Sequence, residues 1–258
     1  MTAATVLQDE IFAAIAAHHG LGPWGRVLDA GTGGHSLAWV AGLGCERFTG
    51  VTLGASTAAE LRAQLGPRLR AQDRVLVGDW RDPALLAGET FDVVLADYLL
   101  GAVEGGAPFF QEALFARLRP HLAREGVLYA VGLEPYPERA ACAWGAAVLE
   151  IARLRDAAIL LFGERPFREH PRAWVEERLR ASGFAVEAAR AFPIRSGERF
   201  VKGQLRIVHQ KLERIPDRDL ARQLGRAAEA LEARALALVA RRDTCAFGED
   251  WLVVARPV

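Results

Sequence analysis

The stretch VLDAGTGGHS, residues 27–36, decides the fold. Its apolar start is typical of a buried strand, and Gly31, Gly33 and Gly34 follow at once. Glycines let a backbone turn tightly and approach a ligand closely. A helix that begins after such a turn presents unpaired N–H groups, so strand, turn and helix together form a cradle for a nucleotide or phosphate. The stretch therefore predicts a nucleotide-type cofactor site in an α/β protein.

The chain has 258 residues, near the upper limit for one hydrophobic core, so we expect a single domain (1–258) with helical insertions at about 137–165 and 196–243. Its 32 Lys and Arg residues balance 32 Asp and Glu residues, and this zero net charge makes nucleic acid an unlikely partner. The apolar residues around 11–17 are too few for a signal peptide or a membrane span. We expect a cytoplasmic protein with no membrane partner.

The cysteines Cys45, Cys142 and Cys245 are odd in number, widely spaced and free of any C-x-x-C pairing. This pattern predicts neither a disulfide framework nor a zinc site, and it favours a reducing compartment. We predict no metal site of any kind.

Short apolar runs alternate with helical stretches, which is the pattern of parallel strands joined by crossover helices. The predicted strands are residues 26–30, 47–53, 74–79, 91–97, 126–133, 184–194 and 250–258. The predicted helices are 56–69, capped by Ser56; 108–122, closed by Gly126; 137–163; 170–183, ending at Gly183; and 217–242, capped by Asp217. Most strands are continuously apolar, as expected when both faces of a sheet are covered.

Two cofactor classes compete for the glycine turn. A dinucleotide fingerprint from Gly31 requires a glycine at position 36 and an acid about 20 residues on. The chain has a serine at position 36, and its second strand ends at Thr52. The turn used for S-adenosylmethionine requires an acid two residues before the first glycine, and Asp29 is there, although the third glycine is replaced by His35. The turn therefore favours S-adenosylmethionine.

The motifs VLDAGTGG, VLVGDW and FDVVLADYLL resemble, in order and spacing, the class I S-adenosylmethionine-dependent methyltransferase family. The resemblance covers residues 24–135 and extends loosely to the C-terminus. It implies an α/β, three-layer Rossmann-like fold with a seven-stranded sheet of order 3-2-1-4-5-7-6 and an antiparallel last strand. The two helical insertions would form a lid. S-adenosylmethionine would be the cofactor and S-adenosylhomocysteine the product.

The resemblance also implies which residues contact the cofactor. Asp79 would accept a hydrogen bond from the adenine amine, the ring of Trp80 would line the adenine slot, and Asp97 would lie near the point of methyl transfer. The full predicted set is Asp29, Gly31, Thr32, Gly33, His35, Thr52, Leu53, Asp79, Trp80 and Asp97.

Several of these residues have a second interpretation. Thr52 stands where the family usually has an acid for the ribose hydroxyls, and losing that charge costs about 1–3 kcal/mol, roughly tenfold to a hundredfold in affinity. His35 either points away from the cofactor or contacts its carboxylate end. Asp29 either contacts the cofactor or satisfies backbone N–H groups, and a tryptophan such as Trp80 is often simply core.

The acceptor is inferred from absences. No N/D-P-P-Y/F tetrapeptide follows the fourth strand, which disfavours amine methylation of nucleic acids, and the basic run at 190–214 is diluted by acids. We predict methyl transfer by in-line displacement to a small-molecule acceptor whose reacting atom is undetermined. Candidate substrate contacts are Tyr98, Glu134, Tyr136 and Arg155; the catalytic candidates are Tyr98 and His209, although a lone histidine is more often packed or solvent-exposed.

A second hypothesis is a methyltransferase-fold protein that has lost catalysis and acts as a binding or scaffold subunit, motivated by Thr52 and His35. The leucine-striped helix 217–242 would then be a face for a possible homodimer, or else an intramolecular core helix. A nicotinamide oxidoreductase is the least favoured hypothesis.

Overall fold

The computed structural model describes residues 3–258 and, for residues 3–9, only the course of the helix. It contains two compact units. The sheet unit comprises residues 12–134, 167–191 and 251–258. The helical unit comprises residues 135–166 and 192–250 together with the described residues up to Ile11.

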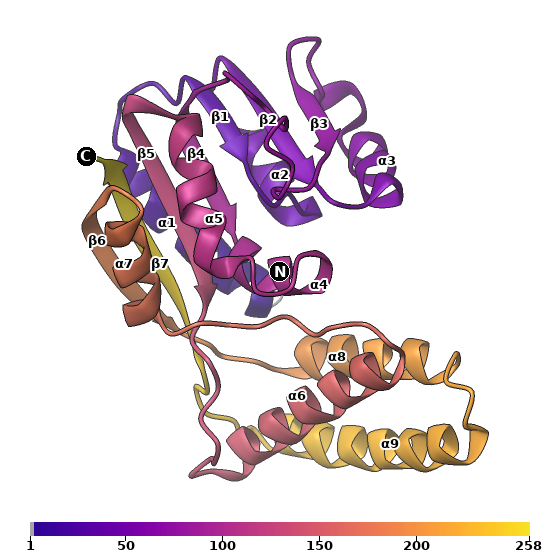
Figure 1. The fold of residues 1–258 in the computed structure, drawn as a ribbon. Helices are drawn as coiled ribbons and strands as arrows, with labels where there is room; N and C mark the ends of the chain where they lie inside the picture. Colours follow the sequence, from indigo (N-terminus) through magenta and orange to yellow (C-terminus); the bar gives the residue numbers. More distant parts are fainter. Residues whose placement is uncertain (1–2) are drawn as a thin grey trace. The chain divides into compact units, whose positions relative to one another are not determined.

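The sheet has seven strands in the order β3-β2-β1-β4-β5-β7-β6, which confirms the predicted topology (Figure 1). The strands are β1 Arg26–Asp29, β2 Arg47–Thr52, β3 Arg74–Val77, β4 Phe91–Asp97, β5 Leu122–Leu133, β6 Phe184–Pro193 and β7 Glu249–Pro257. The pairs β1–β2, β1–β4, β2–β3 and β4–β5 are all parallel. The carboxyl ends of β1 to β4 therefore meet at one edge of the sheet.

Strand β7 runs against β5, as expected for the last strand. Arg256, near the end of β7, donates from Nη1 to the carbonyl oxygen of Glu125 near the start of β5, at 2.8 Å. The ring of Trp251, near the start of β7, fills the space beside Gly132 near the end of β5, so that a Cβ on this glycine would stand 2.3 Å from the ring.

Helices cover both faces of the sheet (Figure 1). The helices of this unit are α1 Ala3–His19, from Phe12 onward, with α2 Gly34–Val40, α3 Ala55–Leu65, α4 Leu99–Gly106, α5 Gln111–Leu118 and α7 Arg172–Ala181. Leu114 of α5 and Leu179 of α7 are buried in one cluster with Leu128 of β5. The next residue of β5, Tyr129, points to the opposite face and contacts His19 of α1 at 3.3 Å.

Two predicted helix-end signals are wrong, and the helix predicted over 137–163 begins later, at Ala143. Helix α3 begins at Ala55 with Gly54 before it, so Ser56 lies inside the helix and does not cap it. The helix predicted to close at Gly126 ends at Leu118. Gly126 does not close it, because β5 begins at Leu122, before this glycine.

Gly126 is an interior residue of β5 with a packing role. A Cβ there would stand 3.1 Å from the carbonyl oxygens of Phe91 and Asp92, at the point where the β4–β5 register shifts. Glycine is therefore favoured here by the close approach of two backbones, and not by the end of a helix.

The helical unit is built from α6 Ala143–Leu161, α8 Glu198–Leu212 and α9 Arg218–Ala240. The predicted cap of α9 is confirmed, because the Asp217 carboxylate accepts hydrogen bonds from the N–H groups of Asp219 at 3.1 Å and Leu220 at 2.9 Å. Leu231 and Leu238 of the leucine stripe are buried in the core of this unit, in the same cluster as residues of α6 and α8. The use of the stripe as a dimer face stays a prediction.

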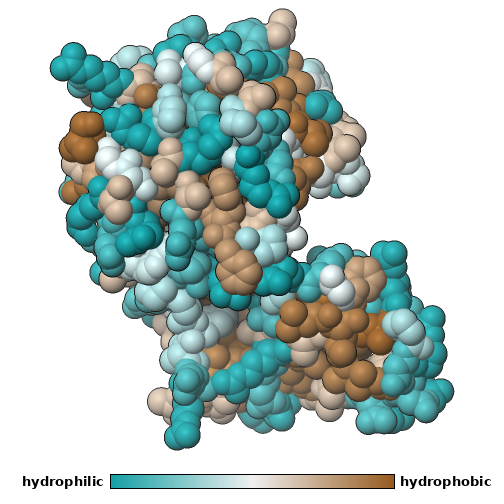
Figure 2. Space-filling model, viewed as in Figure 1, coloured by the Kyte–Doolittle hydropathy of each residue, from teal (hydrophilic) through white to brown (hydrophobic). Residues whose placement is uncertain are grey.

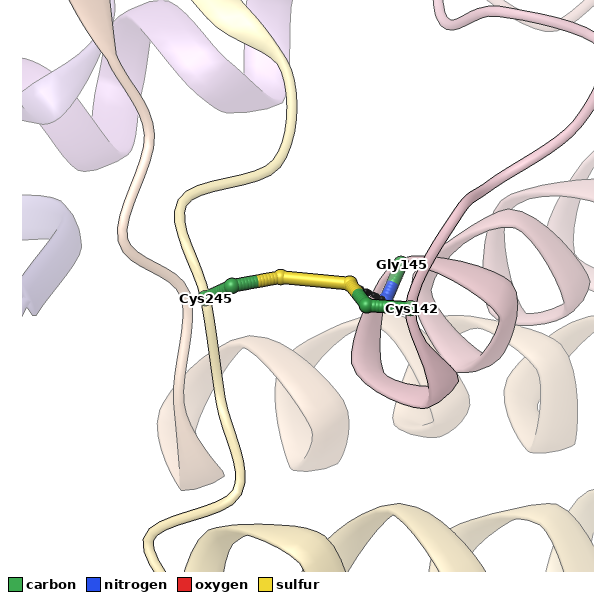
Figure 3. Close-up of a disulfide and its surroundings, with 3 residues drawn as sticks. All are labelled: Cys142, Gly145 and Cys245. Atoms are coloured by element: carbon green, nitrogen blue, oxygen red, sulfur yellow. Dashed lines mark hydrogen bonds between the residues drawn. A yellow bond between two sulfur atoms is a disulfide. The ribbon is translucent and has the colours of Figure 1, made fainter.

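The cysteine prediction is wrong for one pair. Cys142 and Cys245 form a disulfide across 103 residues of sequence (Figure 3). Cys142 also caps α6, since its Sγ accepts from the N–H of Gly145 at 3.3 Å. Wide spacing in sequence concealed the pair because the helical unit brings the start of α6 next to the segment after α9. Cys45 is free and buried in the sheet unit.

On the face drawn in Figure 2, apolar side chains gather over part of the helical unit. Leu160 and Leu161 at the end of α6 are 59% and 44% exposed. Even so, none of the helices described for residues 3–258 combines the length and apolarity that a membrane span requires.

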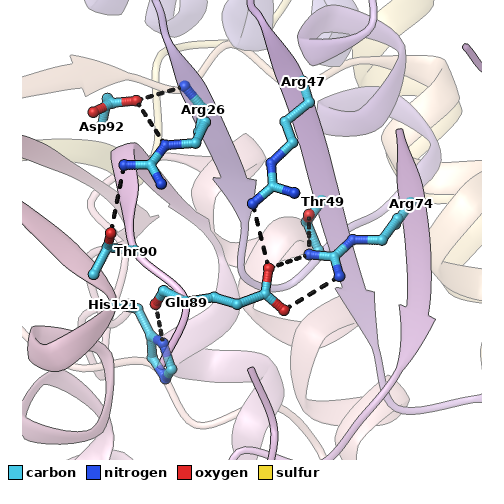
Figure 4. Close-up of polar contacts among 8 residues, drawn as sticks. All are labelled: Arg26, Arg47, Thr49, Arg74, Glu89, Thr90, Asp92 and His121. Carbon is cyan, nitrogen blue, oxygen red and sulfur yellow. Dashed lines mark hydrogen bonds and ion pairs between the residues drawn. The ribbon is translucent and has the colours of Figure 1, made fainter. Parts of the chain in front are cut away.

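At the opposite edge of the sheet from the carboxyl ends, three arginines begin three neighbouring strands (Figure 4). Glu89 accepts from Arg74 Nη2 at 2.6 Å and from Arg47 Nη2 at 3.4 Å. Asp92 accepts from the N–H of Arg26 at 2.7 Å. Like charges on adjacent strands repel, so these carboxylates allow the strands to pair. The hydrogen bond from Arg74 is the main reason that the pKa of Glu89 is lowered.

We expect Glu89→Gln to lower the free energy of unfolding by about 1–2 kcal/mol at neutral pH, since it removes the charge between two arginines. A lowered pKa stabilises the fold above the unfolded carboxyl's pKa, and this contribution is lost as the pH falls through the folded pKa. Urea unfolding of both proteins should therefore show a gap at neutral pH that closes only once the pH has fallen below the lowered pKa of folded Glu89. The control is Glu177→Gln, whose side chain is 70% exposed beside Arg178. An equal loss in both variants would contradict the assignment.

Candidate functional site

A cavity of about 530 Å³ opens at the carboxyl ends of β1 to β4. All of its lining residues belong to the sheet unit. In parallel α/β sheets this edge is where ligands bind. The structure brings nine predicted residues together here: Gly31, Thr32, Gly33, Thr52, Leu53, Asp79, Trp80, Asp97 and Tyr98.

The glycine loop after β1 is held by the strands on both sides. The N–H of Ala30 donates to the carbonyl of Leu95 in β4, and the N–H of Thr32 donates to the carbonyl of Val51 in β2, both at 2.8 Å. These bonds fix the loop as an extension of the sheet, with its outer surface on the cavity.

The two lining glycines of the loop have different reasons to be glycine. A Cβ on Gly31 would stand 2.8 Å from the side chain of Leu99, so packing within the chain requires the glycine. A Cβ on Gly33 would meet no atom within 4 Å, and the φ of Gly33 is −118°, which any residue can adopt. Nothing in the chain therefore requires Gly33, whereas a ligand lying against the loop would.

Asp29 lies behind the loop and is not among the lining residues. It is fully buried, and its Oδ2 accepts from the Ser36 hydroxyl at 2.8 Å. The Ser36 oxygen in turn accepts from the N–H of Gly33 at 3.1 Å. Burial raises the pKa of Asp29 to about 6, opposed by the Thr32 and Ser36 hydroxyls. Asp29 thus supports the loop from beneath through the Ser36 hydroxyl, and its contact with a cofactor stays a prediction.

Trp80 fixes the loop from the side. It is 5% exposed, and its indole Nε1 donates to the carbonyl of Ala30 at 2.7 Å. The Arg117 guanidinium stands 5.4 Å from the ring centroid, and its Nε donates to the Trp80 carbonyl at 3.1 Å. The residue is therefore mostly core, although it is also among the residues that line the cavity.

The Asp79 carboxylate lines the cavity and is held by Arg81. Its Oδ2 accepts from Arg81 Nη2 at 2.6 Å, and its Oδ1 accepts from the Arg81 N–H at 2.9 Å. The hydrogen bonds from Arg81 lower the pKa of Asp79. The group is therefore charged at neutral pH, but a ligand amine would have to share it with Arg81 or displace Arg81.

Hydroxyl groups line the cavity beyond the end of β2. Thr52 is the last residue of that strand, and Thr57 of α3 adds a second hydroxyl that sequence reasoning missed. Its Oγ1 lies 3.0 Å from where a Cβ of Gly54 would be, so Gly54 leaves room for it. A hydroxyl five residues beyond a strand has no motif of its own, which is why only the fold identifies it.

Tyr98 begins the far wall of the cavity in a strained conformation. Its φ of 49° and ψ of 16° are left-handed, which costs a residue with a side chain about 1–2 kcal/mol. Its N–H donates to the carbonyl of Val131 in β5 at 2.9 Å, and its carbonyl accepts the first hydrogen bond of α4. Such strain is concentrated at functional sites, because the surrounding structure has to maintain it.

Besides Asp29, two predicted residues of the sheet unit lie outside the cavity lining. The ring of His35 stacks on that of Phe12, with centroids 5.5 Å apart. Glu134 accepts from the N–H of Arg172 at 2.9 Å, at the start of α7. Ligand contacts for His35 and Glu134 stay predictions.

Tyr136, Arg155 and His209 belong to the helical unit. The ring of Tyr136 stacks on that of Phe247, and Arg155 donates to the side chain of Gln204 at 2.8 Å. His209 is partly buried on α8. No residue of this unit lines the cavity, so the substrate and catalytic roles given to these three stay predictions.

Sequence reasoning missed the apolar wall of the cavity. Val103 of α4, Phe110 before α5 and Phe167 before α7 all line it. Phe167 is 57% exposed and lies more than 50 residues from Phe110 in sequence, so no local pattern connects them. Across residues 3–258, no group of three His, Cys, Asp or Glu side chains is placed to hold a metal ion.

Comparisons with known proteins agree with this architecture. No protein-family model and no curated protein matches the sequence. Among solved structures, the cyclopropane synthase MmaA2 from Mycobacterium tuberculosis is 19% identical with a TM-score of 0.58, over 96% of this chain and 83% of that one. The [4+2]-cyclase SpnF is 18% identical with a TM-score of 0.58, over 99% and 81%.

A third similar structure is a phosphoethanolamine N-methyltransferase from Haemonchus contortus, in complex with phosphomonomethylethanolamine and S-adenosylhomocysteine. It is 14% identical with a TM-score of 0.54, over 96% of this chain and 52% of that one. Strand order, the antiparallel last strand and these likenesses agree: the chain has the fold of the class I S-adenosylmethionine-dependent methyltransferases.

Proposed function

We propose that the chain is an S-adenosylmethionine-dependent methyltransferase with a small-molecule acceptor. One observation carries the proposal. Three segments far apart in sequence, the glycine loop, the residues after β3 and the residues after β4, line a single cavity at the carboxyl edge of this fold. These are the segments on which the sequence resemblance rests.

The residues present fit the cofactor, which supplies, when bound, an electrophilic methyl group on a positively charged sulfur. Gly33 gives the close backbone approach that nothing in the chain requires. Thr52 and Thr57 offer hydroxyls to the ribose, and Asp79 offers a carboxylate to the adenine amine. Aligning acceptor and donor for in-line displacement is worth about 7–11 kcal/mol, so a site of this kind needs few dedicated catalytic groups.

A second candidate is a binding or scaffold protein with weak or no catalysis. It is favoured by the engagement of Asp79 with Arg81 and by the neutral Thr52 in place of an acid. Both features predict weak cofactor binding. The two candidates differ in whether the chain binds cofactor and transfers its methyl group.

Calorimetric titration with S-adenosylmethionine and S-adenosylhomocysteine tests the proposal. We expect both to bind, and we expect Asp79→Ala to weaken binding about tenfold because it removes a charged acceptor. Asp82→Ala is the matched control, because Asp82 lies close in sequence but outside the cavity lining. If neither compound gives binding heat at millimolar concentration, the proposal that the chain is a methyltransferase is refuted. Binding without turnover on a panel of phenols, amines and thiols would favour the second candidate.

Gly33→Ala tests the cradle. The chain has room for the new methyl group, so we expect unchanged thermal unfolding together with at least about tenfold weaker binding of S-adenosylhomocysteine. The control is Gly44→Ala, since a Cβ at Gly44 also meets nothing within 4 Å and this glycine lies outside the cavity lining. Equal affinities in the two variants would show that no ligand approaches Gly33.

Thr52→Asp tests the ribose position. If this residue faces the ribose hydroxyls, restoring a charged acceptor should tighten S-adenosylhomocysteine binding by about tenfold to a hundredfold. The measurement is the same titration. The neighbouring Thr49 is unsuitable as a control position, because it is buried and accepts a hydrogen bond from Arg74. Ser56→Asp, outside the lining on α3, serves instead. An unchanged Kd in Thr52→Asp would remove the ribose assignment.

A further inference from the structure

The far side of the cavity differs in chemistry from the strand side. The strand ends supply the hydroxyls and carboxylates described above, whereas the side chains that α4 and the segments after Tyr98 add to the lining are all apolar. Val103, Phe110 and Phe167 line this part together with Leu53. Leu53 and Phe167 are 55% and 57% exposed, although both are large and apolar. We call these four residues the apolar wall.

The position of Phe167 is fixed by its neighbours. The N–H of Arg168 donates to the carbonyl of Gly101 in α4 at 3.2 Å. The Glu169 carboxylate occupies the space where a Cβ of Gly101 would be, at 2.6 Å. The guanidinium of Arg168 stands 5.4 Å from the ring centroid of Phe109. The segment is thus attached to α4 at several points, and Phe167 is held against the cavity.

The charges of the lining are all negative. Its only ionisable acids are Asp79 and Asp97, and it contains no Lys, Arg or His among the described residues. The nearby cation Arg168 is outside the lining and is paired with the buried Glu104 at 3.7 Å. Arg81 is already engaged with Asp79. An anionic acceptor would therefore enter a cavity lined by two carboxylates and by no cationic side chain that could pair with it.

We infer that the methyl acceptor is an uncharged, apolar molecule, aromatic or alkyl, whose carbon skeleton lies against the apolar wall. The inference rests on the proposed function and deepens it by naming the acceptor class. The exposed surface of Leu53 and Phe167 provides the driving force, because an apolar ligand removes it from water. The absence of a lining cation provides the selectivity against acids, since it disfavours carboxylates and phosphates.

A pair of probes that differ in one group tests the inference. Ligand-observed NMR titrations would compare 2-naphthol with 6-hydroxy-2-naphthoate, with and without saturating S-adenosylhomocysteine. We expect the neutral probe to bind at least about tenfold more tightly. Equal or reversed affinities would overturn the inference, as would the failure of both probes to bind at millimolar concentration.

Variants of Phe167 provide the second arm. Phe167→Ala should weaken 2-naphthol binding about tenfold and leave the S-adenosylhomocysteine affinity unchanged. Phe167→Arg should add the missing cation and reverse the preference of the two probes. Leu160→Ala, at an equally exposed apolar residue of the helical unit, should change neither the affinity for 2-naphthol nor the preference between the two probes. Because Phe167 and Leu160 are both exposed, we expect the midpoint of thermal unfolding to be unaltered in all three variants.

The outcomes separate the two proposals. If the wild-type chain does not bind S-adenosylhomocysteine but still prefers 2-naphthol, the methyltransferase proposal is refuted and an apolar binding site remains. Normal S-adenosylhomocysteine binding, with probe affinities that Phe167→Ala leaves unchanged, would refute the acceptor class and leave the proposed function standing.

Discussion

The cavity depends on one buried interaction, the contact of the Asp29 carboxylate with the hydroxyl of Ser36. Through Ser36 it reaches the N–H of Gly33, while Trp80 holds the carbonyl of Ala30 from the side. The loop is therefore fixed by groups of the chain itself, before any ligand arrives. A site whose shape is already present avoids the entropy cost of ordering a loop on binding, which is how a small number of polar contacts can suffice.

The sheet and the strand-end residues could be predicted because both follow from local patterns. Continuous apolar runs mark buried strands, and Gly31, Asp79 and Tyr98 each come within two residues of the end of one, so a parallel sheet must bring them to one edge. The helix ends were less predictable. A glycine such as Gly126 commonly follows the end of a helix, but here it lies inside β5, where the register between β4 and β5 shifts.

Residues that only the tertiary structure connects could not be found from sequence. Phe167 reaches the cavity through contacts of Arg168 and Glu169 with α4, and none of these has a sequence signature. The Cys142–Cys245 pair depends in the same way on how the helical unit folds. Asp29 shows a different limit of sequence reasoning. Its motif was recognised, but the spacing of a motif does not reveal burial, and the support that this buried carboxylate gives the loop is visible only in the fold.

The same burial gives Asp29 an electrostatic cost that the loop has to bear. A carboxyl whose pKa is raised to about 6 destabilises the folded chain at neutral pH, on the order of 3 kcal/mol, and the cost is relieved as the pH falls from about 6 towards the unfolded value near 4. The sign is opposite to that of Glu89, whose pKa is lowered by Arg74. The starts of β2 and β3 are thus stabilised by a paired charge, whereas the end of β1 carries a carboxylate that is buried away from water. Keeping a costly carboxylate beneath Gly33 is reasonable where the loop's geometry matters more than the stability of the fold, and that is the expectation for a loop that shapes a binding site.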